Sequence, residues 1–174
     1  MLESSKFNFL VDKHKNRIYN YALYMLRNRM DAEDITQEVM IRTWQNINKF
    51  NFNAARAWIM RTTHNLCIDY LRKNSLNLQR EKPIDSEKEN YLEDKSNEGN
   101  PANVANKKMI GTKIKTAIEN LPEKLKSPFV LYELEGFKYR EISKILDVPL
   151  NTVKVNLLRA RKFLQKELNV YKND

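Results

Sequence analysis

The sequence predicts an all-α protein built from two small helical domains joined by a flexible acidic linker. It contains only three Gly and five Pro in 174 residues, whereas strand-rich folds need more turn residues. Apolar residues recur at spacings of three and four along most of the chain, as in amphipathic helices. This periodicity disappears in a polar, acidic stretch after residue 74, which is typical of a linker. We therefore place the N-terminal domain at 1–74, the linker at 75–105 and the C-terminal domain at 106–174.

Three helices are predicted in the N-terminal domain. The first covers Phe7–Met25 and is interrupted by Asn28–Met30, after which the second begins at Asp31. A polar and aromatic break, Lys49–Asn53, separates it from the third helix, at Ala54–Lys73. Each stretch carries one apolar face, so the three helices can enclose a common core.

An acidic patch opens the second helix. It consists of Asp31, Glu33, Asp34 and Glu38. Asp31 can cap the helix, and Asp34 in the first turn suits the positive end of the helix dipole. These roles leave Glu33 and Glu38 unexplained, whereas a surface for a basic protein partner explains all four.

Aromatic and basic residues are interleaved along the third helix and the break before it. Exposed aromatic rings stack on unpaired bases while Lys and Arg follow the backbone, so the mixture suits single-stranded nucleic acid. The alternative is that Trp58 and Tyr70 belong to the core, and for Trp58 the two interpretations stay open. Phe50–Asn53 have less reason to include aromatic residues if the break is only solvated.

Two helices are predicted at the start of the C-terminal domain. The first carries an apolar face from Ile110 to Leu121 and is stopped by Pro122. The second begins at Ser127–Pro128 and ends at Gly136, because glycine favours the backbone conformation that closes a helix.

A helix-turn-helix motif is predicted between Tyr139 and Leu168. Two amphipathic stretches flank the break Asp147–Val148–Pro149, in which Asp147 tolerates a left-handed conformation and Pro149 fixes φ for helix entry. In such motifs the second helix enters the DNA major groove. Its polar positions carry Asn, Thr, Lys and Arg, which can reach base edges or phosphates: Asn151, Thr152, Lys154, Asn156, Arg159, Arg161 and Lys162. An ordinary helical hairpin with a solvated basic face is the alternative.

The charge distribution favours nucleic acid as a partner. Residues 1–74 carry a net charge of +5, residues 99–174 carry +7, and residues 81–98 carry −4. No helix combines Lys and Arg with a broad aromatic and aliphatic face, which argues against a membrane surface. The sequence has no apolar run of about 18 residues and no secretion signal, so we expect a cytoplasmic protein.

Cofactor and enzyme chemistry find little support in the sequence. Cys67 is the single cysteine, which excludes an internal disulfide and a multi-cysteine zinc site. His14 and His64 are far apart and belong to no cluster with metal-ligand spacing. We find no catalytic constellation or phosphate-binding loop and predict neither an enzyme nor a cofactor.

Taken together, these blocks resemble a bacterial extracytoplasmic-function (ECF) sigma factor, a small two-domain alternative sigma factor. The resemblance rests on DAEDITQEVMIRTW, ARAWIMRTTHNLCIDYLRK, LPEKLKSPFVLYELEGFKYREISKIL and VPLNTVKVNLLRARKFL, which occur in the family's order along nearly the whole chain. It implies a non-enzymatic subunit that joins core RNA polymerase and directs it to promoters. The linker resembles the segment that threads towards the polymerase active centre.

The resemblance also implies roles for particular residues. Core-polymerase binding through the clamp helices would fall to Asp31, Glu33, Asp34, Gln37, Glu38, Arg42 and Trp44. Opening of the minus-ten element and capture of an extruded base would fall to Phe50, Asn51, Phe52, Asn53, Arg56, Trp58, Arg61, His64, Asn65, Arg72 and Lys73. Reading of the minus-thirty-five duplex would fall to Arg140, Asn151, Thr152, Lys154, Asn156, Arg159 and Arg161.

The recognition helix departs from the family's common Gly-Thr-Val-Lys-Ser-Arg. It reads Asn151-Thr152-Val153-Lys154-Val155-Asn156, so promoter preference cannot be copied from relatives. The main competing hypothesis is a DNA-binding regulator that never joins the polymerase. Relatives are often held inactive by an anti-sigma factor that wedges between or clamps their domains, and we expect such a partner here.

Overall fold

The structure is a computed structural model that describes residues 2–80 and 101–170 of the chain. All regular secondary structure in these two ranges is helical, which confirms the predicted fold class. Within them, no helix combines the length and the apolar character needed to cross a membrane. The acidic centre of the predicted linker, 81–100, lies outside the described residues.

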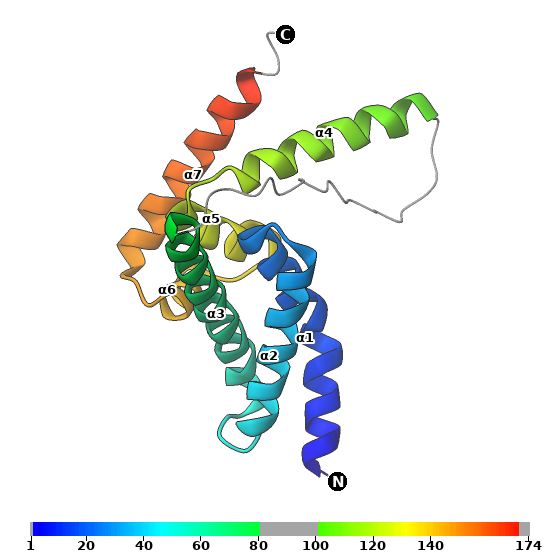
Figure 1. Cartoon of the computed structure of the whole chain (residues 1–174), viewed down its shortest axis with the longest axis vertical. Helices are drawn as coiled ribbons and strands as arrows, with labels where there is room; N and C mark the ends of the chain where they lie inside the picture. The colour runs from blue at the N-terminus through cyan, green and yellow to red at the C-terminus, as the bar shows by residue number, and fades with distance from the viewer. Residues whose placement is uncertain (1, 81–100, 171–174) are drawn as a thin grey trace.

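Helices α1 (Leu2–Leu26), α2 (Arg29–Gln45) and α3 (Phe52–Arg80) form a bundle (Figure 1). Its interior consists of the apolar faces that the periodicity predicts, with Leu10, Ile18, Val39 and Ile59 at most 1% exposed. Burying such side chains contributes about 1.5–3 kcal/mol each. The bundle is the scaffold that holds the predicted polymerase and minus-ten residues.

The second helix begins earlier than predicted. Arg27 adopts a positive φ of 57°, which ends α1, and the chain restarts at Arg29. Asn28 is the N-cap, because its side-chain oxygen accepts a hydrogen bond from the backbone N–H of Asp31 at 3.0 Å. The prediction that Asp31 caps the helix is therefore wrong, since Asn28 satisfies the free N–H one turn earlier.

The third helix is longer than the predicted Ala54–Lys73. It starts at Phe52 because Asn51 accepts the backbone N–H of Ala54 at 2.8 Å and acts as a helix cap. It continues to Arg80, and α4 (Pro101–Glu119) starts inside the range assigned to the linker. Both ends of the predicted linker are thus helical.

The C-terminal part contains α4, α5 (Glu123–Phe129), the π-helix η1 (Val130–Leu134), α6 (Tyr139–Leu146) and α7 (Leu150–Val170). The helix predicted to begin at Ser127–Pro128 begins at Glu123 instead. Pro128 lies within α5 and lacks an N–H donor, and the chain changes to π geometry just after it. Gly136, at φ 71°, closes this segment as predicted.

The helix-turn-helix is present with the predicted break. Asp147 has φ 53° and ψ 50°, the left-handed conformation expected at the turn. Ser143 fastens the corner: its hydroxyl donates to the carbonyl oxygen of Val148 at 2.6 Å, and its own carbonyl accepts the Val148 N–H at 3.1 Å. Val153, Leu157, Ala160 and Leu164 are all less than 9% exposed. This register turns the polar face of α7 outward.

The two parts pack against each other. Helix α3 contacts α6, and α1 contacts α4, α5 and η1 (Figure 1). At this junction the Phe137 ring is only 1% exposed. The Arg17 Nε lies 2.9 Å from a carboxylate oxygen of Glu135, and the Ser127 hydroxyl lies 3.8 Å from the Met25 sulfur. The described residues thus form a continuous hydrophobic core.

Candidate nucleic-acid and polymerase interfaces

The predicted polymerase-binding residues lie together on the outer side of α2. Glu33, Asp34 and Gln37 are exposed, and Asp31 is half-buried beside Tyr70. Near the other end, the Trp44 ring is 44% exposed and packs edge-on against Phe7 with centroids 5.1 Å apart. Since Asn28 supplies the cap, capping does not account for the Asp31 carboxylate.

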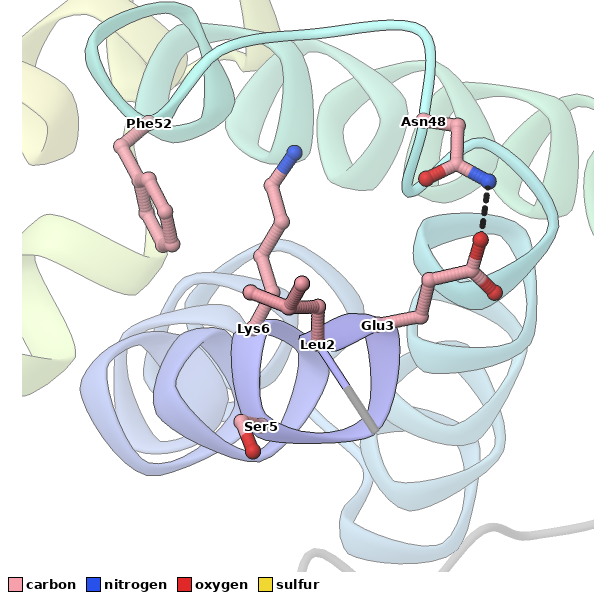
Figure 2. Close-up of a pocket in the computed structure, with 6 residues that line it drawn as sticks. All are labelled: Leu2, Glu3, Ser5, Lys6, Asn48 and Phe52. Atoms are coloured by element: carbon pink, nitrogen blue, oxygen red, sulfur yellow. Dashed lines mark hydrogen bonds between the residues drawn. The ribbon is translucent and has the colours of Figure 1, made fainter.

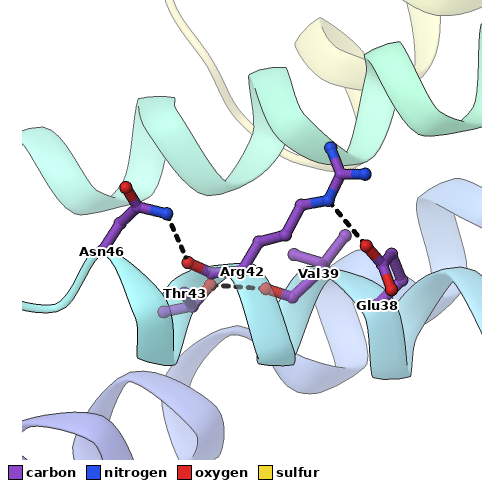
Figure 3. A network of polar contacts seen from close by, with 5 residues as sticks. All are labelled: Glu38, Val39, Arg42, Thr43 and Asn46. Atoms are coloured by element: carbon purple, nitrogen blue, oxygen red, sulfur yellow. Dashed lines mark hydrogen bonds and ion pairs between the residues drawn. The ribbon is translucent and has the colours of Figure 1, made fainter.

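A polar network orders the second half of this surface. Arg42 donates from Nε to Glu38 Oε1 at 2.7 Å, one helical turn away (Figure 3). The Asn46 side chain donates to the Arg42 carbonyl at 2.8 Å and ties down the end of α2. With their side chains 47% and 43% exposed, Arg42 and Glu38 form a solvated pair that adds little stability. They remain available to a partner.

The predicted minus-ten residues begin at the connection between α2 and α3. Phe50 stacks on Trp58 with centroids 5.1 Å apart and an interplanar angle of 29°. Both rings are half-buried, so Trp58 is neither a full core residue nor a free platform. The Phe52 ring is 50% exposed, and Asn53 is exposed next to it. Phe52 is the aromatic group of this segment best placed to meet an unpaired base.

A polar and basic stripe continues along α3. Arg61, Asn65, Arg72 and Lys73 are exposed, and their spacing places the first three near one face of the helix. Arg72 pairs with Asp69 at 2.9 Å, but both side chains are more than half exposed. The stripe can therefore follow a phosphate backbone.

His64 points inward instead of joining this stripe. Its Nδ1 lies 2.8 Å from the hydroxyl of Tyr21, a fully buried residue of α1. Burial lowers the pKa of His64 to about 4, so the ring is neutral at physiological pH. In this arrangement His64 offers no positive charge to DNA.

Arg56 is also separated from the stripe, because it faces the C-terminal part. Its Nη2 donates to the Glu135 carbonyl oxygen at 3.1 Å, and its guanidinium carbon lies 3.9 Å from the centroid of the Phe137 ring. Its Nε is buried and has no hydrogen-bond partner among the described residues. In this packed arrangement the segment before α6 engages the Arg56 side chain, which was predicted to bind DNA.

The predicted minus-thirty-five residues lie on or beside α7. Asn151, Lys154 and Arg159 are exposed, Thr152 and Asn156 are half-buried, and Arg140 is exposed on α6. Arg161 is engaged within its own domain, at 3.1 Å from Glu133. The N-terminal turns of α7 are thus the uncovered part of the motif, as groove reading requires.

Sequence reasoning missed the residues that join the two parts and those that hold the α2–α3 connection. Arg17, Glu135 and Phe137 carried no signal beyond helical spacing, since their partners lie far away in the chain. Lys6 was also missed, although its ammonium reaches the backbone of residues 47 and 50. A lysine at the start of an amphipathic helix is too common to be diagnostic.

The described residues form helices only, and they present an uncovered helix-turn-helix and a second, aromatic and basic surface. This arrangement is typical of a protein that contacts DNA through two separate surfaces. The sequence profile of Sigma-70 region 2 matches residues 10–76, and that of Sigma-70 region 4 matches residues 112–164. The chain is 30% identical over 169 residues to the ECF RNA polymerase sigma factor SigW of Bacillus subtilis, covering 95% of this chain and 90% of that one. The chain belongs to the family of ECF RNA polymerase sigma factors, as the resemblance implied.

Other relatives agree. Identity is also 30% over 159 residues to the ECF RNA polymerase sigma factor SigE of Mycolicibacterium smegmatis, covering 91% of this chain but 60% of that longer protein. A solved complex of the sigma factor RpoE with the anti-sigma factor NepR from Bartonella quintana contains a similar fold, with a TM-score of 0.77, 19% identity, and coverage of 94% of this chain and 97% of that one. The latter shows likeness of fold.

Proposed function

We propose that the chain acts in the bacterial cytoplasm as a promoter-recognition subunit of RNA polymerase and has no catalytic activity of its own. The exposed face of α2 docks on core polymerase, and the N-terminal domain melts and reads the minus-ten element. The helix-turn-helix reads the minus-thirty-five duplex. Family membership supports the overall function, and the uncovered positions of these surfaces support the division of roles.

The observation that carries polymerase binding is the exposed acidic face of α2. Glu33 and Asp34 are exposed and no ion pair to either is found within the described residues. A regulator that acts on DNA alone has no use for an acidic surface beside its DNA-binding stripe, because that surface would repel phosphates. A basic protein surface makes use of it.

Reading of the minus-ten element follows from the chemistry of the second surface. Unstacking a base costs a few kcal/mol, which stacking and pocket contacts must offset. Phe52 supplies an exposed ring, and Arg61, Asn65 and Arg72 supply polar and cationic groups along the next turns of α3. Arg56 joins this set only after it leaves Phe137, so full engagement of the melted strand requires the two domains to separate.

We also propose control by an anti-sigma factor. One protein of similar fold, the sigma factor RpoE, was solved in complex with the anti-sigma factor NepR. In this chain the contact of Arg56 with Phe137 already joins the two domains. A partner that bound both domains would keep them packed against each other, with Arg56 on Phe137 and away from DNA.

Binding to core RNA polymerase tests the proposal. We expect Asp34→Arg to reduce the affinity of the chain for core enzyme at least tenfold, because it places a cation against a basic partner. Asp12→Arg is the matched control, since it makes the same charge change at an exposed position of α1. Equal affinities for wild type and Asp34→Arg, with both folded by circular dichroism, would contradict the assignment of α2.

A further inference from the structure

The first turns of α1 hold the α2–α3 connection. Residues 2–9 precede the matched region-2 segment, which starts at residue 10, and apart from the place of Phe7 in the first predicted helix no role was predicted for them. They form the start of α1, which lies alongside the connection, residues 46–51 (Figure 2). Contacts from this N-terminal stretch therefore act on the segment that precedes the exposed Phe52 ring.

Lys6 makes the central contacts. Its ammonium donates to the carbonyl oxygen of Ile47 at 2.8 Å and to that of Phe50 at 2.9 Å. These two carbonyls lie three residues apart, so a single ammonium, which has three N–H donors, fixes the curvature of the connection. Figure 2 shows the side chain extending from α1 into the space below the connection.

The same ammonium also faces the aromatic rings. Its nitrogen lies 5.6 Å from the ring centroid of Phe50 and 5.4 Å from that of Phe52. Both distances are within the range of cation–π attraction. Lys6 thus connects the backbone of the connection with the orientation of the rings that flank the proposed base-binding site.

Neighbouring residues of α1 contact the middle of the connection and the first residue of α3. Glu3 accepts a hydrogen bond from the Asn48 side chain at 2.6 Å (Figure 2). Phe9 packs edge-on against Phe52 with centroids 5.5 Å apart. An open hollow of about 340 Å³ remains beside these groups, and Leu2, Glu3, Ser5, Lys6, Asn48 and Phe52 line it. Glu3, Lys6 and Phe9, which we call the brace, therefore fix the connection without covering the Phe52 ring.

Fixing this segment matters because binding must otherwise supply its ordering entropy. Each backbone residue that becomes ordered only on binding adds an entropic cost to binding, and a site ordered in advance avoids that cost. The connection and Phe52 must be in place when a base leaves the duplex stack. A connection held from α1 meets that requirement before DNA arrives.

We propose that Lys6 is a positioning residue for minus-ten recognition, acting through the α2–α3 connection. The inference rests on the proposed function, since it assumes that this connection and Phe52 meet the melted strand. The competing role for a lysine at this place is a direct contact with a DNA phosphate. The two roles differ in their dependence on salt.

The test uses holoenzyme made from core RNA polymerase and the full chain, with a promoter that the wild-type holoenzyme transcribes. Promoter opening is measured by the permanganate reactivity of thymines. Closed-complex formation is measured by footprinting at low temperature. Lys6→Met removes the donors, Lys6→Arg keeps them, and Lys15→Met removes the same charge from an exposed position on the same helix. Glu3→Ala breaks the second contact of the brace at an exposed residue and leaves no cavity in the core.

We expect Lys6→Met to reduce the equilibrium constant for opening by about ten- to a hundredfold, the range for hydrogen bonds from a charged group. Closed-complex affinity and the salt dependence of binding should stay at wild-type values, and Lys6→Arg should restore opening. Glu3→Ala should reduce opening to a smaller extent, and Lys15→Met should not. The Lys6→Met holoenzyme should also discriminate less strongly than the wild type, in its opening, between the promoter and versions of it altered at single melted bases.

Three results would overturn the inference. The first is wild-type opening by Lys6→Met. The second is a salt dependence reduced by about one counterion in parallel with the loss of opening, which would identify a phosphate contact. The third is loss of opening by Lys6→Met through unfolding while a folded Glu3→Ala variant opens normally. A wild-type chain that never directs transcription would instead refute the proposed function, so the two failures are distinguishable.

Discussion

Replacing Arg17 with Met should weaken the junction between the two domains without altering any proposed DNA contact. Arg17 lies 2.9 Å from Glu135, and the two side chains are 28% and 10% exposed. Burial raises the pKa of Glu135 even though Arg17 and Arg56 lower it. The carboxylate is therefore only partly compensated with Arg17 present, and it would be left without its ion-pair partner in the variant.

The magnitude follows from the burial of the pair. Removing one partner of a fully buried ion pair costs about 3–5 kcal/mol. Because Arg17 is partly solvated, we expect Arg17→Met to lower the free energy of unfolding by a smaller amount, about 2 kcal/mol. Arg17→Met/Glu135→Gln should recover most of this loss, since it also removes the buried charge, whereas Glu135→Gln alone keeps a hydrogen-bond acceptor and should cost less than about 1 kcal/mol.

Urea unfolding at pH 7, followed by circular dichroism, measures these differences. At a slope of about 2 kcal/mol/M, Arg17→Met should lower the midpoint by about 1 M. The single-stranded minus-ten DNA should also bind more tightly to this variant, because Arg56 leaves Phe137 more easily. An unchanged midpoint, or a double variant as unstable as Arg17→Met, would refute the reasoning about the buried carboxylate.

Three further predictions concern other parts of the chain. Burial lowers the pKa of both His14 and His64 to about 4; between pH 6.5 and 4 the unfolded chain then binds protons that the folded chain does not. The free energy of unfolding should therefore decrease as the pH is lowered through that window, by up to about 3 kcal/mol for His64 at its acid end, and the urea midpoint should be lower at pH 5 than at pH 7.5. Asp147→Val should lower stability by about 2 kcal/mol, because a β-branched residue is strained at φ 53°, while Asp147→Gly should not lower the melting temperature. Asn156→Arg should tighten binding of the minus-thirty-five duplex and steepen its salt dependence by about one counterion, which titrations at several salt concentrations will test.

The sequence was sufficient where the structure depends on local contacts. Spacing alone identified the buried face of α7, and the tolerance of Asp147 for a left-handed backbone located the turn before it. Helix ends were less predictable, because several residues could serve as caps. Asn28 and Asn51 both fulfil this role. Other asparagines near them in the sequence do not act as N-caps, so the residue type alone does not identify the cap.

Contacts between distant residues could not be predicted from the pattern. Arg56 has the same sequence context as the other basic residues of α3, yet its partners Glu135 and Phe137 lie about eighty positions away. His64 fits the aromatic and basic pattern equally well, but the buried Tyr21 hydroxyl holds it inside. Lys6 reaches the connection across 41 and 44 residues. Only the folded chain reveals which polar side chains are already engaged.

Transcription from genomic DNA by core RNA polymerase with and without the chain tests the central claim most directly. The start sites are mapped by sequencing the transcripts. We predict a defined set of new start sites, each preceded by two shared sequence elements, with the Asp34→Arg variant failing to produce them. Start sites that are identical with and without the wild-type chain, together with no binding to core enzyme, would contradict the account.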